Sequence, residues 1–586
     1  MMRKALLALA CLAVVVGGVS AADAATRSTS AKKPNKNPWE VTVVRFAKGT
    51  SLAQMQAAIA SAGGGGVITD LSKLNRLAVA PGSAGASAFI TKIKANRAVV
   101  GAAVERVVAD VLPDSNGARG DSKGPQLGSP GVDTPPDPFH EISTIFGLDT
   151  QPEGMQWDDD RMNVPAAWSK TLGDRTVRVA VVDTGVQGSH KELNANYLNQ
   201  DSVNTIPCNT LTREFGPGVP SLIGDCSSED KEGHGTWVAG RIAGAVNGFG
   251  SNGVAPNVAV MGVKVLAVGF GGFTSWIVDG MIHACDANAD IINMSLGGYD
   301  AVTDVEDYLM WVDAVNYCRA KGTAIFASAG NEHVRINRVD LKVGDRNLTG
   351  VGQVDAGDEG IASILPGDKL EDYDLRRLLE VPAGVPGVIM VSATNNKVNA
   401  APNAFSWGST VVGNKDQLTY YSSYGSRVDI TAPGGARKFN IPRYDGGPGD
   451  ILADGWGTLG PVDPSGDLCR SAGDIFTFAC FVYKGAGFGF LQGTSMSSPN
   501  ASGVGALVLA AHPELQGHPD QLLARLTATA RKDMVNFMGP NDPNNKADST
   551  VAGPCPTGYC HIDQTRPISF ADAYGAGMVN AGAATG

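Results

Sequence analysis

From about Gln151 onward, the chain alternates strands that are apolar on both faces with helical segments. A strand with two apolar faces is typical of a parallel sheet, because crossover helices cover both sides of such a sheet. We therefore predict an α/β fold of three layers, with a parallel sheet in the middle and right-handed crossovers. The expected strands are 177–183, 258–266, 290–298, 323–331 and 387–395, and the main helices between them are 235–246, 274–287 and 304–322.

Three stretches, 199–228, 332–381 and 435–488, interrupt this alternation. Apolar periodicity fades in each of them, which is typical of loops rather than of buried elements. We expect each stretch to be an inserted surface loop of the main domain, which spans 151–586.

Three segments of different composition precede the main domain. Residues 1–24 combine Arg3 and Lys4, an apolar run and small residues at cleavage spacing, which is typical of a secretory signal peptide. Residues 38–108 have the strand–helix order of a small two-layer α+β domain. Residues 109–150 are rich in Pro, Gly, Asp and Ser, so we expect a linker that contains a processing site.

The overall charge and hydropathy exclude some partners. The formal net charge is −11 and no dense Lys/Arg cluster occurs, which argues against nucleic-acid binding. No segment after the signal is long and apolar enough to span a bilayer. We therefore expect a secreted, extracellular protein without a membrane partner once the signal is cut.

Cleavage of the signal leaves eight cysteines, and an even number in an exported chain favours disulfides. The absence of a C-x-x-C pair makes a zinc site a weak alternative. Proximity in the sequence suggests the pairs Cys208–Cys226, Cys469–Cys480 and Cys555–Cys560. The two remaining cysteines, Cys285 and Cys318, would then pair with each other or remain buried thiols on successive helices.

Polar residues with complementary chemistry gather where the predicted strands end. Asp183, Ser295 and Asn331 each follow an apolar strand, while His234 and Ser495 each open a helix. In a parallel α/β sheet the active crevice lies outside the carboxyl ends of the strands. A carboxylate, an imidazole and a hydroxyl at one edge are the set that acyl transfer needs.

Each member of this set has a chemical reason to be there. A serine hydroxyl is a poor nucleophile until a base takes its proton, and histidine has a suitable pKa. An aspartate fixes the tautomer of that histidine. The backbone N–H of Ser495, at a helix N-terminus, and the side-chain amide of Asn331 could stabilise the oxyanion.

Several of these features also have a simpler structural interpretation. Ser495 alone would be read as a helix cap. His190 also follows Asp183 and could compete with His234 as the base, although its motif context favours a structural role. The acidic run 158–160 is read as a solvated face rather than a metal site.

The motifs DTGV (183–186), GHGTWVAG (233–240) and GTSMSSP (493–499), in the order Asp, His, Ser, resemble those of the subtilisin family of serine proteases. The segments SLGG and ASAGNE resemble that family too, and the likeness spans about 155–584. By this resemblance Asp183 orients His234, His234 is the general base, and Ser495 is the nucleophile. Asn331 is the oxyanion donor, and the residues expected to bind the substrate backbone are Ser295, Leu296, Gly297, Gly298, Gly269, Gly271 and Gly330.

The resemblance also implies partners. The substrate would be a polypeptide, bound as a strand against two backbone segments. The domain at 38–108 resembles the ferredoxin-like inhibitory propeptides of the family, so it would act as an intramolecular inhibitor. We expect a monomer that needs no cofactor for catalysis, with structural calcium in oxygen-rich loops as a further expectation.

The chain departs from the family pattern at two positions. Asn500 stands where a histidine is common, and Trp237 follows HGT. Two other functions stay open. An insertion could close one end of the cleft and make a tripeptidyl-type exopeptidase, or the chain could be a catalytically silent binding protein.

Overall fold

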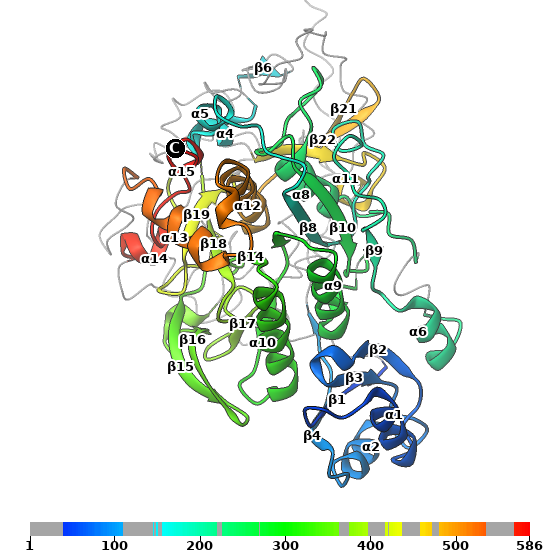
Figure 1. The fold of residues 1–586 in the computed structure, drawn as a ribbon. Coiled ribbons are helices and arrows are strands. Elements are labelled where there is room, and N and C mark those ends of the chain that lie inside the picture. Colours follow the sequence, from blue (N-terminus) through cyan, green and yellow to red (C-terminus); the bar gives the residue numbers. More distant parts are fainter. Residues whose placement is uncertain are drawn as a thin grey trace, which may run out of the picture.

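The structure is a computed structural model, and the two main bodies of the chain are seen in Figure 1. It describes residues 39–108, 144–145, 148–149, 155–219, 226–268, 270–361, 374–395, 416–419, 421–435, 457–470, 480–534 and 568–586. The predicted signal peptide and nearly all of the predicted linker lie outside these ranges. Within them, no helix has the length and hydropathy needed to cross a membrane.

The centre of the main domain is a seven-stranded sheet in which every neighbouring pair is parallel. The first strand of this sheet, β8, lies in its interior, because β9 and β10 are added on one side of it and β12, β14, β18 and β19 are added on the other. This reversal makes the carboxyl end of β8 a topological switch point. In spatial order the strands are β19 (Ile430–Pro433), β18 (Ile389–Thr394), β14 (Ala324–Ser328), β12 (Ile291–Met294), β8 (Arg178–Asp183), β10 (Ala259–Lys264) and β9 (Val203–Asn204).

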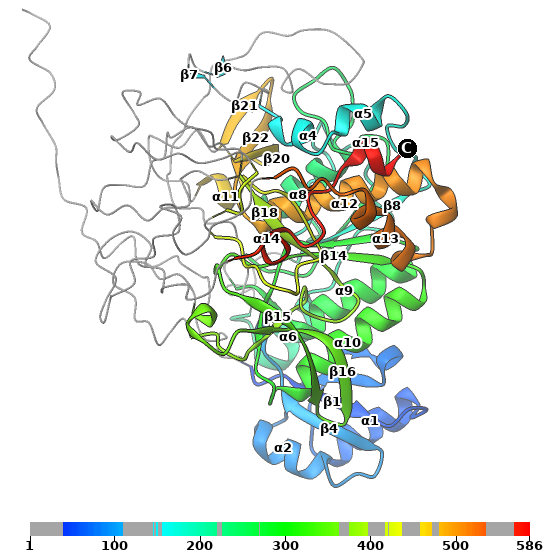
Figure 2. The ribbon, with the colours of Figure 1, turned by 90° about the vertical axis from the view of Figure 1, so that its left-hand side faces the viewer.

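Helices cover both faces of this sheet, as the sequence predicts (Figures 1 and 2). On β8, Val179 and Val181 join the apolar core formed with α8 (His234–Ala243) and α12 (Thr494–Ala511). The alternate residues Ala180 and Val182 join the core on the other face, with α9 (Thr274–Asp286) and α10 (Val305–Ala320). The remaining helices are α4 (Trp157–Arg161), α5 (Val164–Trp168), α6 (Cys208–Phe215), α11 (Asp467–Arg470), α13 (Pro519–Thr529), α14 (Phe570–Tyr574) and α15 (Ala581–Ala584).

The N-terminal domain is a four-stranded antiparallel sheet in the order β2-β3-β1-β4, which is the ferredoxin-like arrangement. One face of the sheet packs on its own two helices. The other face shares the apolar core of α9 and α10, so the domain rests on the main domain. Its elements are β1 (Thr42–Phe46), α1 (Leu52–Ser61), β2 (Val67–Leu71), β3 (Arg76–Val79), α2 (Ala86–Ile93), β4 (Val99–Val104) and β5 (Val107–Val108).

The expectation that the insertions are loops is wrong where the structure describes them. The second insertion forms most of a four-stranded sheet, and the third forms a three-stranded sheet. The hairpin β15–β16 alternates exposed and half-buried residues along much of its length, which hides its strands from an apolar-periodicity test. The strands are β13 (Gly298–Asp300), β15 (Ile336–Val343), β16 (Arg346–Val354) and β17 (Leu379–Val381) in one sheet, and β20 (Thr458–Val462), β21 (Cys480–Tyr483) and β22 (Ala486–Leu491) in the other.

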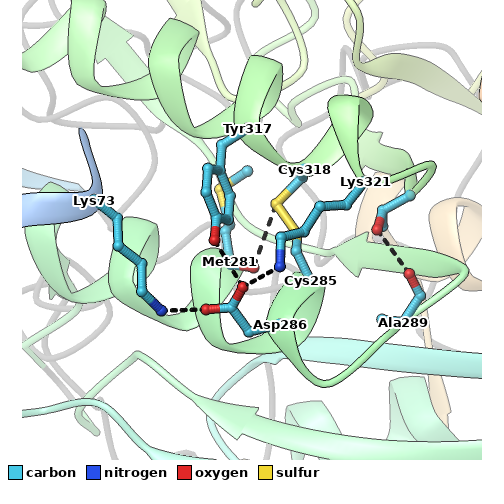
Figure 3. Close-up of a disulfide and its surroundings, with 9 residues drawn as sticks. Lys73, Met281, Cys285, Asp286, Ala289, Tyr317, Cys318 and Lys321 are labelled. Carbon is cyan, nitrogen blue, oxygen red and sulfur yellow. Dashed lines mark hydrogen bonds and ion pairs between the residues drawn. A yellow bond between two sulfur atoms is a disulfide. The ribbon is translucent and has the colours of Figure 1, made fainter.

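Within the described residues there are three disulfides, Cys208–Cys226, Cys285–Cys318 and Cys469–Cys480. The alternative of buried thiols on α9 and α10 is therefore wrong, since Cys285 and Cys318 join the two helices (Figure 3). Beside this bridge, Asp286 pairs with Lys73 of the N-terminal domain and with Lys321. The predicted pair Cys555–Cys560 lies outside the described residues.

Candidate active site

Asp183 and His234 meet at the carboxyl end of the central strand. Asp183 is the last residue of β8, His234 is the first residue of α8, and both side chains are fully buried. The Asp183 Oδ1 atom lies 2.8 Å from His234 Nδ1 and also accepts the Thr184 N–H at 2.7 Å. Because a carboxylate only accepts, Nδ1 donates, and Nε2 is therefore the basic nitrogen of the neutral ring.

The start of α8 is held by acidic residues that the sequence analysis missed. Asp230 accepts hydrogen bonds from the N–H groups of Gly233 and Thr236, both at 2.8 Å. Glu232 accepts the N–H of His234 at 2.6 Å. Carboxylates that precede a helix favour its N-terminus, so acids just before the GHGT motif were a signal that could have found these residues.

Close packing at this point also requires a glycine. A side chain at residue 235 would place its Cβ 2.1 Å from the Gly185 carbonyl and 3.2 Å from Asp183 Cβ. Only glycine lets the start of α8 approach the end of β8 this closely. The two motifs DTGV and GHGT are therefore coupled through backbone contact as well as through the Asp183–His234 hydrogen bond.

Ser495 is the second residue of α12 and is fully buried. Its hydroxyl donates to the Ser295 carbonyl at 3.3 Å, and the Ser295 hydroxyl donates to the Ser495 carbonyl at 2.7 Å. The structure thus brings the predicted nucleophile to the end of β12. Since α12 contacts α8 on the same face of the sheet, Ser495 and His234 begin neighbouring helices.

Asn331 follows β14 and turns its side chain toward the start of α12. Its Oδ1 atom accepts both the N–H and the hydroxyl of Thr494, at 2.9 and 2.8 Å. This pair of donors fixes which amide atom is oxygen, so Nδ2 points the other way. Nδ2 is buried and has no hydrogen-bond partner among the described residues. Asn331 is held by Thr494, the residue that precedes Ser495. A buried donor without an acceptor at this place is what an oxyanion site requires.

The first group of residues expected to bind the substrate backbone runs from the predicted nucleophile to the inserted sheet. Ser295 contacts Ser495, whereas the Leu296 side chain is part of the core, so only its backbone could face a ligand. Gly297 links it to Gly298, which pairs with Val381 in the inserted sheet.

The remaining expected positions are glycines. Gly330 has a φ of 97°, and a Cβ there would lie 2.6 Å from Glu332 Oε2. Gly271 donates to the Ala267 carbonyl at 3.0 Å, and Gly269 lies outside the described residues. The next residues, Gly272 and Phe273 (β11), pair with Val108 and Val107 of the N-terminal domain.

His190 is confirmed as structural. Its Nε2 atom lies 3.1 Å from the Gly487 carbonyl, and its ring meets Phe488 edge-on. Burial lowers its pKa to about 4, so the ring stays neutral near pH 7. The Asp183 carboxylate bonds to His234 instead.

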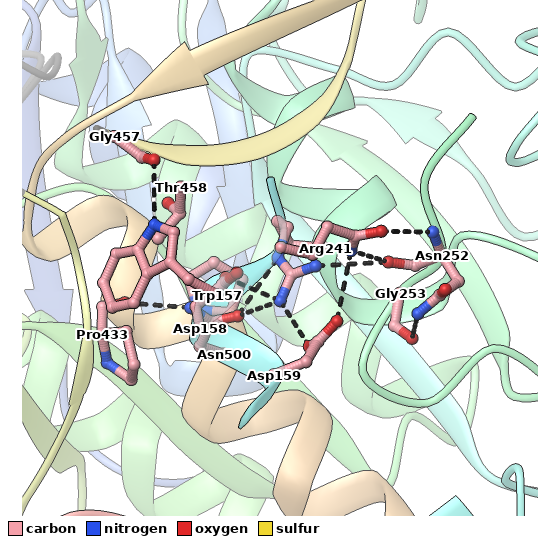
Figure 4. A network of polar contacts seen from close by, with 12 residues as sticks. Trp157, Asp158, Asp159, Arg241, Asn252, Gly253, Pro433, Gly457, Thr458 and Asn500 are labelled. Atoms are coloured by element: carbon pink, nitrogen blue, oxygen red, sulfur yellow. Dashed lines mark hydrogen bonds and ion pairs between the residues drawn. The ribbon is translucent and has the colours of Figure 1, made fainter. Parts of the chain in front are cut away.

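The expectation of a solvated face at 158–160 is wrong for two of its three residues. Asp158 and Asp159 are fully buried and pair with Arg241 of α8 at 2.8 and 2.9 Å (Figure 4). The short helix α4 turns these two carboxylates inward, while Asp160 is exposed. Among the described residues, no group of three or more His, Cys, Asp or Glu side chains could hold a metal ion.

Both departures from the family motifs have structural partners. Asn500 accepts from Arg241 at 2.9 Å and donates to Asp158 at 3.2 Å, so it completes the buried network in Figure 4. Trp237 donates to the Gly489 carbonyl at 2.9 Å and packs against the inserted sheet at Gly460. Asn500 therefore connects α12 to the buried network, and Trp237 connects α8 to the inserted sheet.

The fold and site define a protein with a parallel α/β sheet and an Asp–His–Ser set at its carboxyl edge. The family model described as "Subtilase family" (Peptidase S8) matches residues 174–553, and the chain belongs to this family of serine proteases. Subtilisin NAT of Bacillus subtilis subsp. natto is 26% identical over 378 residues, 64% of this chain and 66% of that one. Subtilisin of Bacillus pumilus is also 26% identical, over 64% of this chain and 92% of its own.

Solved structures support the fold. The epidermin leader peptide processing serine protease from Staphylococcus aureus superposes with a TM-score of 0.57 at 18% identity, covering 93% of this chain and 98% of that one. Fervidolysin from Fervidobacterium pennivorans gives a TM-score of 0.54 at 19% identity, over 94% of this chain and 62% of that one. The predicted subtilisin-like α/β architecture is therefore confirmed.

Proposed function

We propose that this protein is a secreted serine endopeptidase that cuts polypeptides through an acyl-enzyme and is made as a self-inhibited precursor. The observation that carries the proposal is the buried 2.8 Å hydrogen bond between Asp183 and His234. It leaves one imidazole nitrogen as a base at the edge where Ser495 begins its helix. A silent binding protein would have no need to keep a carboxylate and an imidazole buried there, since burying polar groups without function costs stability.

The chemistry follows from the roles of these atoms. Ser495 Oγ would attack the scissile carbonyl carbon while His234 Nε2 takes the hydroxyl proton, and Asp183 would stabilise the resulting imidazolium. The carbonyl oxygen becomes an oxyanion beside Asn331 Nδ2 and the Ser495 N–H. The C–N bond then breaks as His234 returns the proton to the leaving amine, and water hydrolyses the acyl-enzyme by the same steps in reverse.

Self-inhibition is supported by the last strand of the N-terminal domain. Val107 and Val108 pair antiparallel with Phe273 and Gly272, next to one of the two segments proposed to bind the substrate backbone. The chain leaving Val108 therefore starts beside the cleft. Residues 109–150 would then carry the processing site.

A fluorophosphonate probe tests the proposal, because it labels a serine only when a base activates it. The matured protein should take one label at Ser495, and Ser495→Ala should take none. Absence of label on the mature, folded protein would refute the enzyme and favour the silent binding protein. Products from a defined peptide separate the alternatives: mixed lengths indicate an endopeptidase, whereas successive tripeptides indicate the exopeptidase.

Structural calcium remains a proposal of its own. Carbonyl and amide oxygens of loops could supply ligands without a carboxylate cluster. If calcium is bound, a chelator should lower the melting temperature of the Ser495→Ala chain, and added calcium should restore it. An unchanged melting temperature would remove the proposal.

A further inference from the structure

Four carboxyl groups, three of them buried and one half-buried, lie where the N-terminal domain meets the main domain. Glu105 comes from the end of β4, Asp300 ends β13, and Asp304 and Asp307 lie at the start of α10. Glu105, Asp300 and Asp307 are each at most 3% exposed. The cluster exists only while the two domains are docked, because Glu105 comes from one of them and the aspartates from the other.

One cation faces this cluster. Arg106, from the N-terminal domain, pairs with Asp304 at 2.8 Å and donates its backbone N–H to Asp307 at 3.2 Å. The nearby Glu306 already pairs with Arg45 at 2.8 Å. With every group ionised, the four carboxylates and one guanidinium would leave a net charge of −3 in a buried place, which is costly.

The hydrogen bonds show which carboxyl oxygens have no partner to stabilise a negative charge. Glu105 accepts the N–H and, at 3.0 Å, the hydroxyl of Ser275 at the start of α9, so each oxygen of this acid has a hydrogen-bond donor. By contrast, Asp300 Oδ2 and Asp307 Oδ1 are buried and have no hydrogen-bond partner among the described residues. A protonated carboxyl in these two places removes charge that nothing else neutralises.

We infer that the start of α10 is a docking surface that binds the N-terminal domain with uptake of protons, so that docking is tight in mild acid and weakens as pH rises. The inference rests on the proposed role of the N-terminal domain as inhibitor and names what controls its release. The partner is the domain's own Glu105–Arg106 segment, whose guanidinium pairs with Asp304 while its carboxyl group joins the buried acids.

The direction of the effect follows from proton linkage. Burial raises the pKa of Asp300 to about 7 and that of Glu105 to about 8, and it raises the pKa of Asp307 strongly, with the neighbouring carboxylates adding to the shift. After undocking, water solvates these acids and they lose their protons. Docking therefore takes up protons between about pH 4 and pH 8, and rising pH favours release across that window.

The test uses the full-length Ser495→Ala chain, which cannot process itself, with an engineered cleavage site within 109–150. After the cut, gel filtration at several pH values measures how much N-terminal domain stays bound. Uptake of one to two protons predicts that the dissociation constant rises roughly 10- to 100-fold per pH unit between pH 5.5 and 7. Catalytic activity plays no part, so this result is independent of the proposed hydrolysis.

Asparagine variants identify the groups. Asp300→Asn and Asp307→Asn imitate the protonated acids, so each should flatten the pH dependence and together they should keep the domain bound at pH 8. Asp345→Asn is the matched control, since that acid faces Arg45 in the same interface but is 61% exposed, and it should keep the wild-type slope. Retention that does not change with pH, whether complete or absent, would overturn the inference, as would a wild-type slope in the double variant.

Discussion

At the scale of single residues, the site depends on hydrogen bonds that leave one atom of each group available. His234 uses Nδ1 on Asp183, and Asn331 uses Oδ1 on Thr494. In both cases a fixed contact on one side orients the atom on the other.

Replacing Asn331 by leucine keeps its approximate shape but removes the Nδ2 donor. We expect kcat to fall roughly 10²–10³-fold with little change in KM, because the donor acts mainly on the oxyanion. Steady-state kinetics on a peptide substrate, normalised to active sites, measures this. Thr494→Val is the matched control: the backbone N–H at 2.9 Å still holds Asn331, so its loss should be much smaller. An unchanged kcat in Asn331→Leu would exclude the oxyanion role.

His190 should make the fold sensitive to acid. Its pKa is lowered to about 4 by burial, against about 6.5 in an unfolded chain, so protons bind the unfolded state preferentially. Stability is then lost as pH falls from about 6.5 to 4, by on the order of 3 kcal/mol. Urea unfolding of the Ser495→Ala chain with His190→Gln should show a shallower loss over this range. The same exchange at the exposed His518 should leave the slope as it was.

At the scale of elements, a buried ionic network joins three helices. Arg241 of α8 contacts Asp158 and Asp159 of α4 and Asn500 of α12. The two helices that begin with His234 and Ser495 are therefore tied to each other and to the first helix after the linker. Maturation must leave α4 attached for this network to persist.

Removing the arginine would strand two buried carboxylates. We expect Arg241→Met to destabilise the protein by roughly 3–5 kcal/mol, because breaking one side of a buried ion pair leaves uncompensated charge. Denaturant unfolding of the Ser495→Ala chain measures this. Arg376→Met, which breaks the exposed pair with Asp374, should cost at most about 1 kcal/mol. Equal losses of unfolding free energy in the two variants would show that the buried network stabilises the fold no more than the exposed pair does.

At the scale of the whole molecule, the N-terminal domain completes the surface of the main domain. Its sheet covers α9 and α10, and β5 adds to β11. A parallel sheet with its first strand in the centre needs many contacts between distant parts of the chain, and such topologies fold slowly. A preformed surface on which α9 and α10 can pack should therefore make folding faster.

Deletion of the first 154 residues should therefore slow refolding. We expect the Ser495→Ala main domain alone to refold roughly tenfold or more slowly than the full-length Ser495→Ala chain. Recovery of native near-ultraviolet circular dichroism after dilution from denaturant measures the rate. Equal rates for the two chains would show that the N-terminal domain acts only after folding.

The amino-acid sequence alone determined the layers and predicted the site residues, because both depend on local patterns. Doubly apolar strands indicate burial on two faces, and Asp183, His234 and Ser495 stand at strand ends and helix starts in recognisable motifs. The same local logic identified the ferredoxin-like order of the N-terminal domain and the pairs Cys208–Cys226 and Cys469–Cys480, while it left Cys285–Cys318 as one of two alternatives.

Only the tertiary structure decided features that depend on distant partners. Asp158 and Asp159 look solvated in sequence, but Arg241, some 80 residues away, makes their burial tolerable. The inserted hairpin β15–β16 could not be recognised from apolar periodicity, because its strands bury only part of each face. The carboxyl cluster around Asp300 and Asp307 forms only when the two domains meet. Its charge and its burial therefore cannot be read from the sequence.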